Sequence, residues 1–128
     1  MTRALRAALL SCVLGFVCTA CAAEKQAAPE WLLRTWTKTL DEDNGPPDSI
    51  TFRADGTFVT YDEQCSEHAN RYFVDGGLVF LVIPMEKGPV ALVLKPERDH
   101  SSMTFTSPRT RNNAVYAASD SPHCKRQH

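Results

Sequence analysis

From about residue 34 onward, hydrophobic and polar residues alternate along the chain with a period of two, the repeat of a β-strand with two different faces. Eight such runs are separated by short polar or glycine-containing segments. They cover residues 34–40, 49–54, 57–63, 68–74, 78–83, 89–95, 101–107 and 112–118. Asp55-Gly56 and Asp75-Gly76-Gly77 stand between runs and favour hairpins. The pattern therefore predicts an all-β domain of about eight antiparallel strands joined by short turns.

The order of these strands predicts a closed sheet. Consecutive short hairpins favour an up-and-down meander, and eight strands can close into a small barrel that holds side chains or one small ligand. Closure also removes exposed strand edges. A short helical turn is expected from Pro29, because proline is tolerated in a first turn. Aromatic residues at strand spacing are expected in the core: Trp31, Trp36, Phe52, Phe58, Phe73, Phe80 and Phe105.

The start of the chain has a different pattern, typical of a secretory signal peptide. Arg3 and Arg6 precede an uncharged, mostly apolar run over residues 7–17, and small residues follow. This run is shorter than the roughly 20 residues that a membrane-spanning helix needs. We therefore predict a signal peptide at 1–20, a tether at 21–28 and one barrel domain at 29–128.

Two outcomes of signal processing differ at Cys21. Ala20-Cys21-Ala22 fits the A-x-A cleavage pattern, which would release a soluble periplasmic protein. Cys18-Thr19-Ala20-Cys21 resembles a bacterial lipobox, in which the last cysteine is lipidated and becomes the first residue of the mature chain. No aspartate follows Cys21, so this resemblance implies an outer-membrane lipoprotein facing the periplasm. We favour lipidation of Cys21, and soluble export remains the alternative.

Composition narrows the possible partners. Removal of residues 1–20 leaves about 108 residues, one domain's worth. The removed segment holds two of the 14 basic residues and no acidic residue, so the mature chain has a net charge of about −3. A nucleic-acid-binding protein would instead be expected to carry a clustered basic face. We therefore expect no nucleic-acid partner.

Two of the five cysteines, Cys65 and Cys124, lie outside the export signal and its processing site. In an oxidising compartment two such cysteines most simply form a disulfide. The alternative is a zinc site formed with His68 and His123. Adjacent ligands at 123 and 124 would be strained on one metal, so the disulfide is favoured and no metal or cofactor is expected.

The segment between the last two predicted strands is the candidate ligand- or partner-binding site. It carries Arg109, Arg111, Asn112 and Asn113. Guanidinium groups present forked donors that suit a carboxylate or a phosphate. The alternative is a solvated turn in which the asparagines bond to the backbone. No nucleophile-elbow or catalytic-cysteine motif occurs, so no catalytic residue is proposed and the protein is not expected to be an enzyme.

Three stretches carry a resemblance to a known family. They are Leu32-Leu33-Arg34-Thr35-Trp36, the hairpin from Ile50-Thr51-Phe52 through Asp55-Gly56-Thr57-Phe58, and the late strand ending in Val115-Tyr116. Over most of residues 30–118 the chain resembles the small lipocalin-like, calycin-type β-barrel lipoproteins of the bacterial envelope. The resemblance implies a barrel that opens with a short turn.

Together these features predict an exported, lipid-anchored, non-enzymatic binding protein of the cell envelope. Its partner would be a small ligand or an envelope protein, including an enzyme that it inhibits. A structural or assembly factor of the envelope and a Cys/His metal-binding protein are the alternatives. An apolar cavity in the barrel would favour a small ligand, whereas a filled interior with an exposed apolar or charged surface would favour a protein partner.

Overall fold

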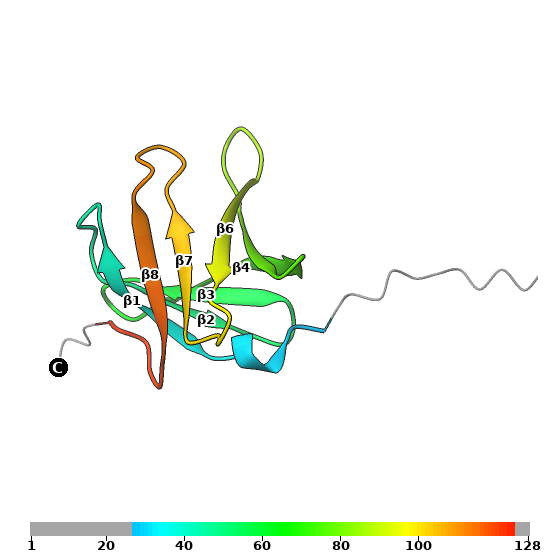
Figure 1. The fold of residues 1–128 in the computed structure, drawn as a ribbon. Helices are drawn as coiled ribbons and strands as arrows, with labels where there is room; N and C mark the ends of the chain where they lie inside the picture. The colour runs from blue at the N-terminus through cyan, green and yellow to red at the C-terminus, as the bar shows by residue number, and fades with distance from the viewer. Residues whose placement is uncertain (1–26, 125–128) are drawn as a thin grey trace, which may run out of the picture.

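A computed structural model describes residues 27–124 and confirms the predicted all-β fold. Eight antiparallel strands form a closed barrel in which each strand lies beside its neighbours in sequence and β8 returns to β1 (Figure 1). The elements are η1 (Glu30–Leu32), β1 (Thr35–Asp41), β2 (Ser49–Phe52), β3 (Thr57–Tyr61), β4 (Glu67–Asp75), β5 (Leu78–Ile83), β6 (Val90–Pro96), β7 (Ser102–Thr106) and β8 (Asn113–Ser119). The predicted signal peptide at 1–20, the predicted lipidation site Cys21 and most of the predicted tether lie outside the described residues.

Turns fall where the sequence predicts them. Gly56, Gly76 and Gly77 have φ values of +85°, +56° and +77°. These left-handed conformations are easily adopted only by glycine, which is why the hairpins form at these positions. β2 ends at Phe52, so Ala54, the last residue of the predicted strand 49–54, lies in the turn and is exposed.

The inside of the barrel is filled with side chains. Its buried members are Leu32, Trp36, Ile50, Phe52, Phe58, Tyr72, Val79, Leu81, Leu94, Met103, Ala114 and Tyr116. Phe52 meets Tyr72 edge to face, with ring centroids 5.0 Å apart, a favoured arrangement for aromatic pairs. Trp36 is fully buried, and its indole N–H donates a hydrogen bond of 3.2 Å to the Leu32 carbonyl.

The turn η1 closes one end of the barrel. Leu32 is fully buried in the core, and Trp31 packs edge-on against Trp36 with ring centroids 6.2 Å apart. Trp31 also stacks on His100 from the β6–β7 turn, with ring centroids 4.1 Å apart. A 3-10 turn this short has little stability of its own, so it is held by these contacts with the barrel.

Two of the seven predicted core aromatics are not in the core. Phe73 is 48% exposed and Phe80 is half-buried. Their ring centroids lie 4.8 Å apart in a parallel stack. The interior positions belong to their neighbours Tyr72 and Val79, so alternation places both phenylalanines outside. The prediction was wrong because residues 72–74 and 78–83 are apolar on both faces of their strands, so strand spacing alone does not show which face is inside.

The C-terminal segment runs along the outside of the barrel. Cys124 forms the predicted disulfide with Cys65 in the β3–β4 turn, with a Cα–Cα distance of 5.5 Å. The backbone N–H of His123 donates to Ser49 Oγ at 2.7 Å, and Ser49 is only 1% exposed. The segment therefore covers part of β2. Because the disulfide uses both thiols, Cys65 and Cys124 cannot serve as thiolate ligands for zinc.

Candidate functional site

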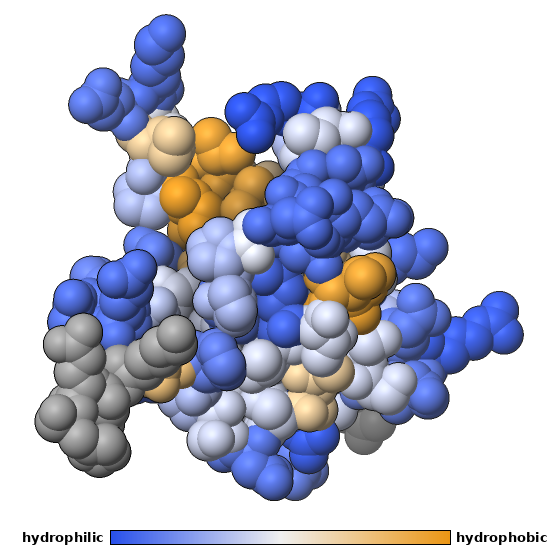
Figure 2. Space-filling model, turned by 90° about the vertical axis from the view of Figure 1, so that its left-hand side faces the viewer, coloured by the Kyte–Doolittle hydropathy of each residue, from blue (hydrophilic) through white to orange (hydrophobic). Residues whose placement is uncertain are grey.

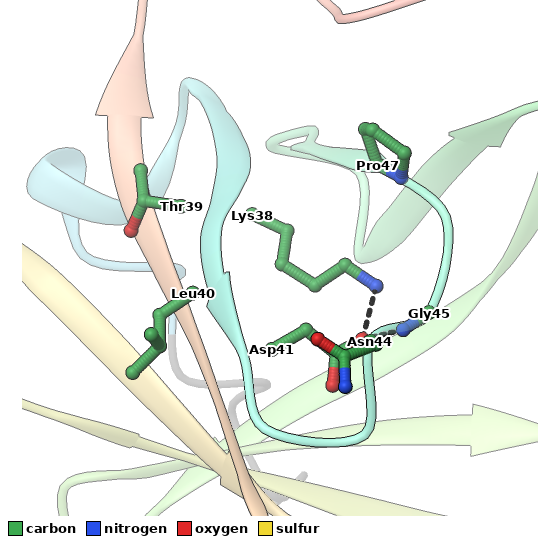
Figure 3. A pocket seen from close by; sticks show the side chains of 7 residues that line it. All are labelled: Lys38, Thr39, Leu40, Asp41, Asn44, Gly45 and Pro47. Atoms are coloured by element: carbon green, nitrogen blue, oxygen red, sulfur yellow. Dashed lines mark hydrogen bonds and ion pairs between the residues drawn. The ribbon is translucent and has the colours of Figure 1, made fainter.

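Two depressions lie on the surface outside the filled core, and both are open to solvent. The first, of about 280 Å³, is lined by Lys38, Thr39, Leu40, Asp41, Asn44, Gly45 and Pro47 (Figure 3). The second, of about 430 Å³, is lined by Leu33, Arg34, Thr35, Thr51, Phe52, Ala118, Ser119 and Asp120. Neither has the enclosed apolar character that small-molecule sites usually have.

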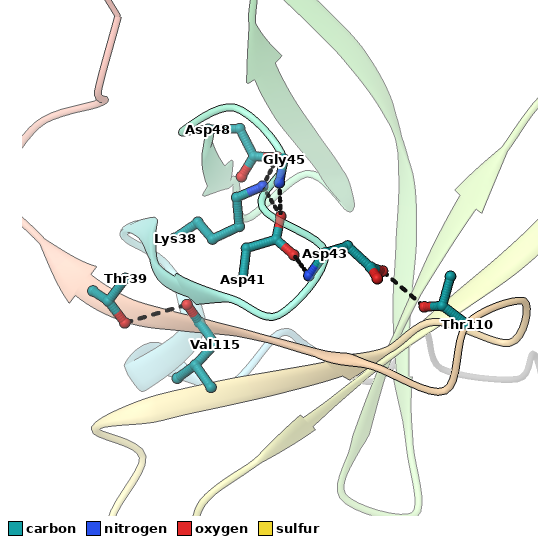
Figure 4. A network of polar contacts seen from close by, with 8 residues as sticks. All are labelled: Lys38, Thr39, Asp41, Asp43, Gly45, Asp48, Thr110 and Val115. Atoms are coloured by element: carbon teal, nitrogen blue, oxygen red, sulfur yellow. Dashed lines mark hydrogen bonds and ion pairs between the residues drawn. The ribbon is translucent and has the colours of Figure 1, made fainter.

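A lysine within the barrel wall organises the first depression. Lys38 Nζ donates to Asp41 Oδ2 at 2.8 Å and lies 3.7 Å from Asp48 Oδ2 (Figure 4). Asp41 also accepts the backbone N–H groups of Asp43 and Gly45, at 2.9 and 3.0 Å. The hydrogen bond from Lys38, with the loop N–H groups, holds the pKa of Asp41 below its usual value. Lys38 therefore stabilises the conformation of the β1–β2 loop through these contacts.

The Lys38–Asp41 pair gives a pH-dependent prediction. The Lys38→Met variant should raise the pKa of Asp41 toward its usual value, because the main donor to the carboxylate is lost. A lowered folded-state pKa stabilises the fold above the unfolded-state pKa, and that contribution disappears as pH falls through the folded-state value. NMR titration of the carboxyl groups measures the pKa of Asp41 in the wild type and in the Lys38→Met variant. Asp55, whose lowered pKa depends mainly on Thr57, should be unchanged, and an unchanged Asp41 would contradict the assignment.

Near Lys38, burial raises the pKa of the Tyr116 hydroxyl, and the carboxylates of Asp48 and Asp41 raise it further. Tyr116 lies opposite Lys38 in the β1–β8 pairing. The phenol therefore stays protonated and acts as a packing residue in the barrel. Its position gives no indication of a nucleophile or a base.

The structure places the predicted β7–β8 cluster beside the β1–β2 loop. Asp43 accepts hydrogen bonds from Thr110 Oγ1 at 2.8 Å and from Asn112 Nδ2 at 2.7 Å (Figure 4 draws the bond to Thr110). Asn113 Oδ1 accepts from Thr106 Oγ1 at 2.7 Å. The side-chain amides of Asn112 and Asn113 therefore bond to other side chains, Asp43 and Thr106, and not to backbone groups as the solvated-turn alternative expects.

The two arginines of the cluster are not used in this way. Arg109 and Arg111 are exposed, and neither forms an ion pair with any residue that the structure describes. Arg111 has a φ of +66°, a left-handed backbone conformation that belongs to the turn. The two guanidinium groups of this cluster therefore remain available to a partner, and neither lines one of the two depressions described above.

Sequence reasoning missed an apolar outer surface of the barrel, which we call the β4–β6 face. Its centre is a row across three strands: Phe73 on β4 pairs with Phe80 on β5, which pairs with Val93 on β6. Phe73 is 48% and Val93 is 38% exposed. The run at 78–83, which is apolar on both faces, could have indicated this surface. A strand in a barrel turns one face to the core and the other outward, so such a run must place apolar side chains on the outside.

The opposite part of the wall is polar. Hydroxyl groups form a ladder across β1, β2 and β3, with Thr35 to Thr51 and Thr51 to Tyr61 each 2.8 Å apart. Thr37 Oγ1 extends the ladder, because it lies 2.8 Å from Ser49 Oγ and 2.8 Å from Ser119 Oγ. Viewed from the left-hand side of Figure 1, most of the visible surface is hydrophilic, and the strongest hydrophobic colour is confined to a cluster near the top and a smaller one on the right (Figure 2). The β4–β6 face is therefore distinct in its chemistry from the β1–β3 wall.

Among residues 27–124, no group of three or more His, Cys, Asp and Glu side chains is arranged to hold a metal ion. In the same part of the chain, no helix is long and apolar enough to cross a membrane. Comparisons of the chain with protein-family models, with curated proteins and with solved structures gave no match.

Proposed function

We propose that this chain is an exported, lipid-anchored, non-enzymatic binding protein of the bacterial cell envelope, related to the lipocalin-like barrels, and that it acts on a protein partner. The observation that supports a protein partner is the filled barrel. Trp36, Phe58 and Met103 are at most 1% exposed and occupy the interior where a ligand would lie. An exposed apolar surface outside a filled core is typical of protein–protein contact.

The outer surface offers two kinds of contact to such a partner. The β4–β6 face supplies a stacked pair of aromatic rings, and aromatic residues dominate the energetics of many interfaces. The exposed guanidinium groups of Arg109 and Arg111 supply charge at a barrel rim, where it would steer association. Inhibition of an envelope enzyme is one form that this binding can take. A structural or assembly role would use the same surfaces with a permanent partner.

The predicted anchor would hold the barrel close to a membrane. The chain enters the barrel at η1 (Figure 1), and the proposed tether at 21–28 precedes it directly. Eight residues can span at most about 28 Å when fully extended. A lipid on Cys21 would therefore keep the barrel within one molecular diameter of the bilayer surface.

Mass spectrometry of the protein purified from the native envelope tests the anchor. We expect a mature chain that begins at Cys21 and carries lipid. The Cys21→Ala variant should lose that mass, whereas Cys12→Ala, inside the proposed signal peptide, should yield the same mature protein. An unmodified chain that begins at Ala23 would contradict lipidation. It would leave the binding function of the barrel untouched.

The same preparation separates a protein partner from a small ligand. Native mass spectrometry should find the barrel without any bound small molecule, because its interior is packed. Capture from the envelope should recover a specific protein with the wild type and less of it with Phe73→Ser. A stoichiometric small molecule, together with equal capture by both proteins, would contradict the proposed mode of binding.

A further inference from the structure

We infer that the β4–β6 face is a self-association surface and that its occupant is a second copy of this chain. The inference rests on the proposed function in one respect, since both assume that the barrel acts through contact with a protein. What it adds is the identity of that protein. The argument comes from the order of apolar and charged residues across the face.

The face consists of three rows of side chains. In the first row Arg71 pairs with Val82 and Val82 with Ala91, and in the central row Phe73, Phe80 and Val93 follow one another across the strands. In the third row Asp75 pairs with Leu78, and the continuing register places Lys95 beside Leu78. All nine side chains alternate with the core residues of β4, β5 and β6, so they point outward.

The charges lie only in the outer rows. Arg71, Asp75 and Lys95 are exposed, and none of them forms an ion pair with a residue in the described part of the chain. Asp75 and Lys95 share a row on strands about 10 Å apart and form no ion pair with each other. The face therefore presents two positive groups and one negative group without internal partners around an aromatic centre.

This arrangement is complementary to itself. Two copies that pack face to face are related by a two-fold axis in the plane of the interface. If the axis lies across the strands, β4 faces β4 and Arg71 of each copy meets Asp75 of the other. If the axis runs along the strands, β4 faces β6 and Asp75 meets Lys95. Each arrangement stacks the Phe80 rings at the centre and forms two opposite-charge contacts without a like-charge one.

The size of the face predicts weak association. Three strands about 4.8 Å apart and five residues long cover much less than the roughly 800 Å² per partner of a standard stable interface. The pairing should therefore be reversible when the protein is dilute. Attachment of both copies to one membrane would raise their effective concentration and favour the pair.

Cysteine trapping in the oxidising envelope tests the inference with the full, exported chain. Phe80→Cys places a thiol at the centre of the face in both two-fold arrangements, whereas Ala54→Cys places one on an exposed hairpin turn away from it. Non-reducing electrophoresis should show about tenfold more covalent homodimer for Phe80→Cys than for Ala54→Cys, as expected for specific pairing at high local concentration. Equal amounts of dimer in the two variants would overturn the inference.

Charge exchange then checks the predicted contacts. Adding Asp75→Lys to Phe80→Cys should reduce the trapped homodimer, because like charges would face each other in both arrangements. Adding Arg71→Asp as well should restore it if the axis lies across the strands, and adding Lys95→Asp should restore it if the axis runs along them. No effect of Asp75→Lys, or loss without rescue by either partner change, would overturn self-pairing.

The outcome of this test is separable from that of the proposed function. If position 80 forms no homodimer while wild-type protein still captures a different envelope protein, only the inference of self-association fails. Thermal unfolding of each variant, followed by circular dichroism, shows that a lost dimer does not come from a lost fold.

Discussion

The Trp36→Ala variant is expected to unfold with a free energy about 3–5 kcal/mol lower than that of the wild type, the usual range for removal of a large aromatic side chain from a core. Trp36 is fully buried in the barrel. It also receives the edge of Trp31 and donates to the Leu32 carbonyl, so its loss releases η1 as well as leaving a cavity. Because small domains are stable by only about 5–15 kcal/mol, this is a large fraction of the total.

Urea unfolding followed by circular dichroism measures this effect. Phe73→Ala is the matched control, since it removes an aromatic ring from the outer face and should cost about 1 kcal/mol or less. If Trp36→Ala does not fold, Trp36→Phe keeps most of the buried volume and should show an intermediate loss. Equal losses for the Trp36 and Phe73 variants would contradict the assignment of inside and outside.

Removal of the disulfide should cost the barrel about 4 kcal/mol, the loop-closure estimate for a bond between residues 59 apart in sequence. The double variant Cys65→Ser/Cys124→Ser should still form the eight-stranded barrel, because strand closure runs through β1 and β8 and not through the disulfide. Its C-terminal segment, held otherwise by the His123–Ser49 hydrogen bond, should become accessible to proteases.

Denaturant midpoints of the wild type and the double variant give the stability difference, and limited proteolysis gives the accessibility of residues 120–124. Ser49→Ala serves as the control, since it keeps the disulfide but removes the acceptor for His123 and the bond to Thr37, at a cost of about 1 kcal/mol for each bond. Identical midpoints for the double variant and the wild type would show that the disulfide contributes nothing to stability.

The fold was predictable because strand alternation and turn residues agree along the whole domain. The run 78–83 coincides with β5 at both ends, and the glycine turns at 56 and 76–77 set the hairpins. Pairing of Cys65 with Cys124 was predicted from the oxidising compartment that a signal peptide would imply, and the structure confirms the bond. Local pattern and long-range closure thus pointed to the same barrel.

The surface was less predictable, because the side of a doubly apolar strand that faces the core depends on its neighbours. Phe80 could have been placed inside or outside from its own strand, and only the pairing of β5 with β4 and β6 shows that Val79 and Leu81 occupy the interior. The partners of Asn112 were equally hidden, since Asp43 lies 69 residues away in sequence. Such contacts arise only once the barrel has closed.

Site-specific photo-cross-linking in the native envelope tests the central claim that this barrel acts through its outer β4–β6 face. A photoreactive amino acid at Phe73 should form a discrete adduct with a protein, a second copy of the chain if the self-association inference holds. The same amino acid at Ala54, on the exposed β2–β3 turn, should form none. An absence of protein adducts at 73, or equal adducts at both positions, would contradict the proposed role of this face.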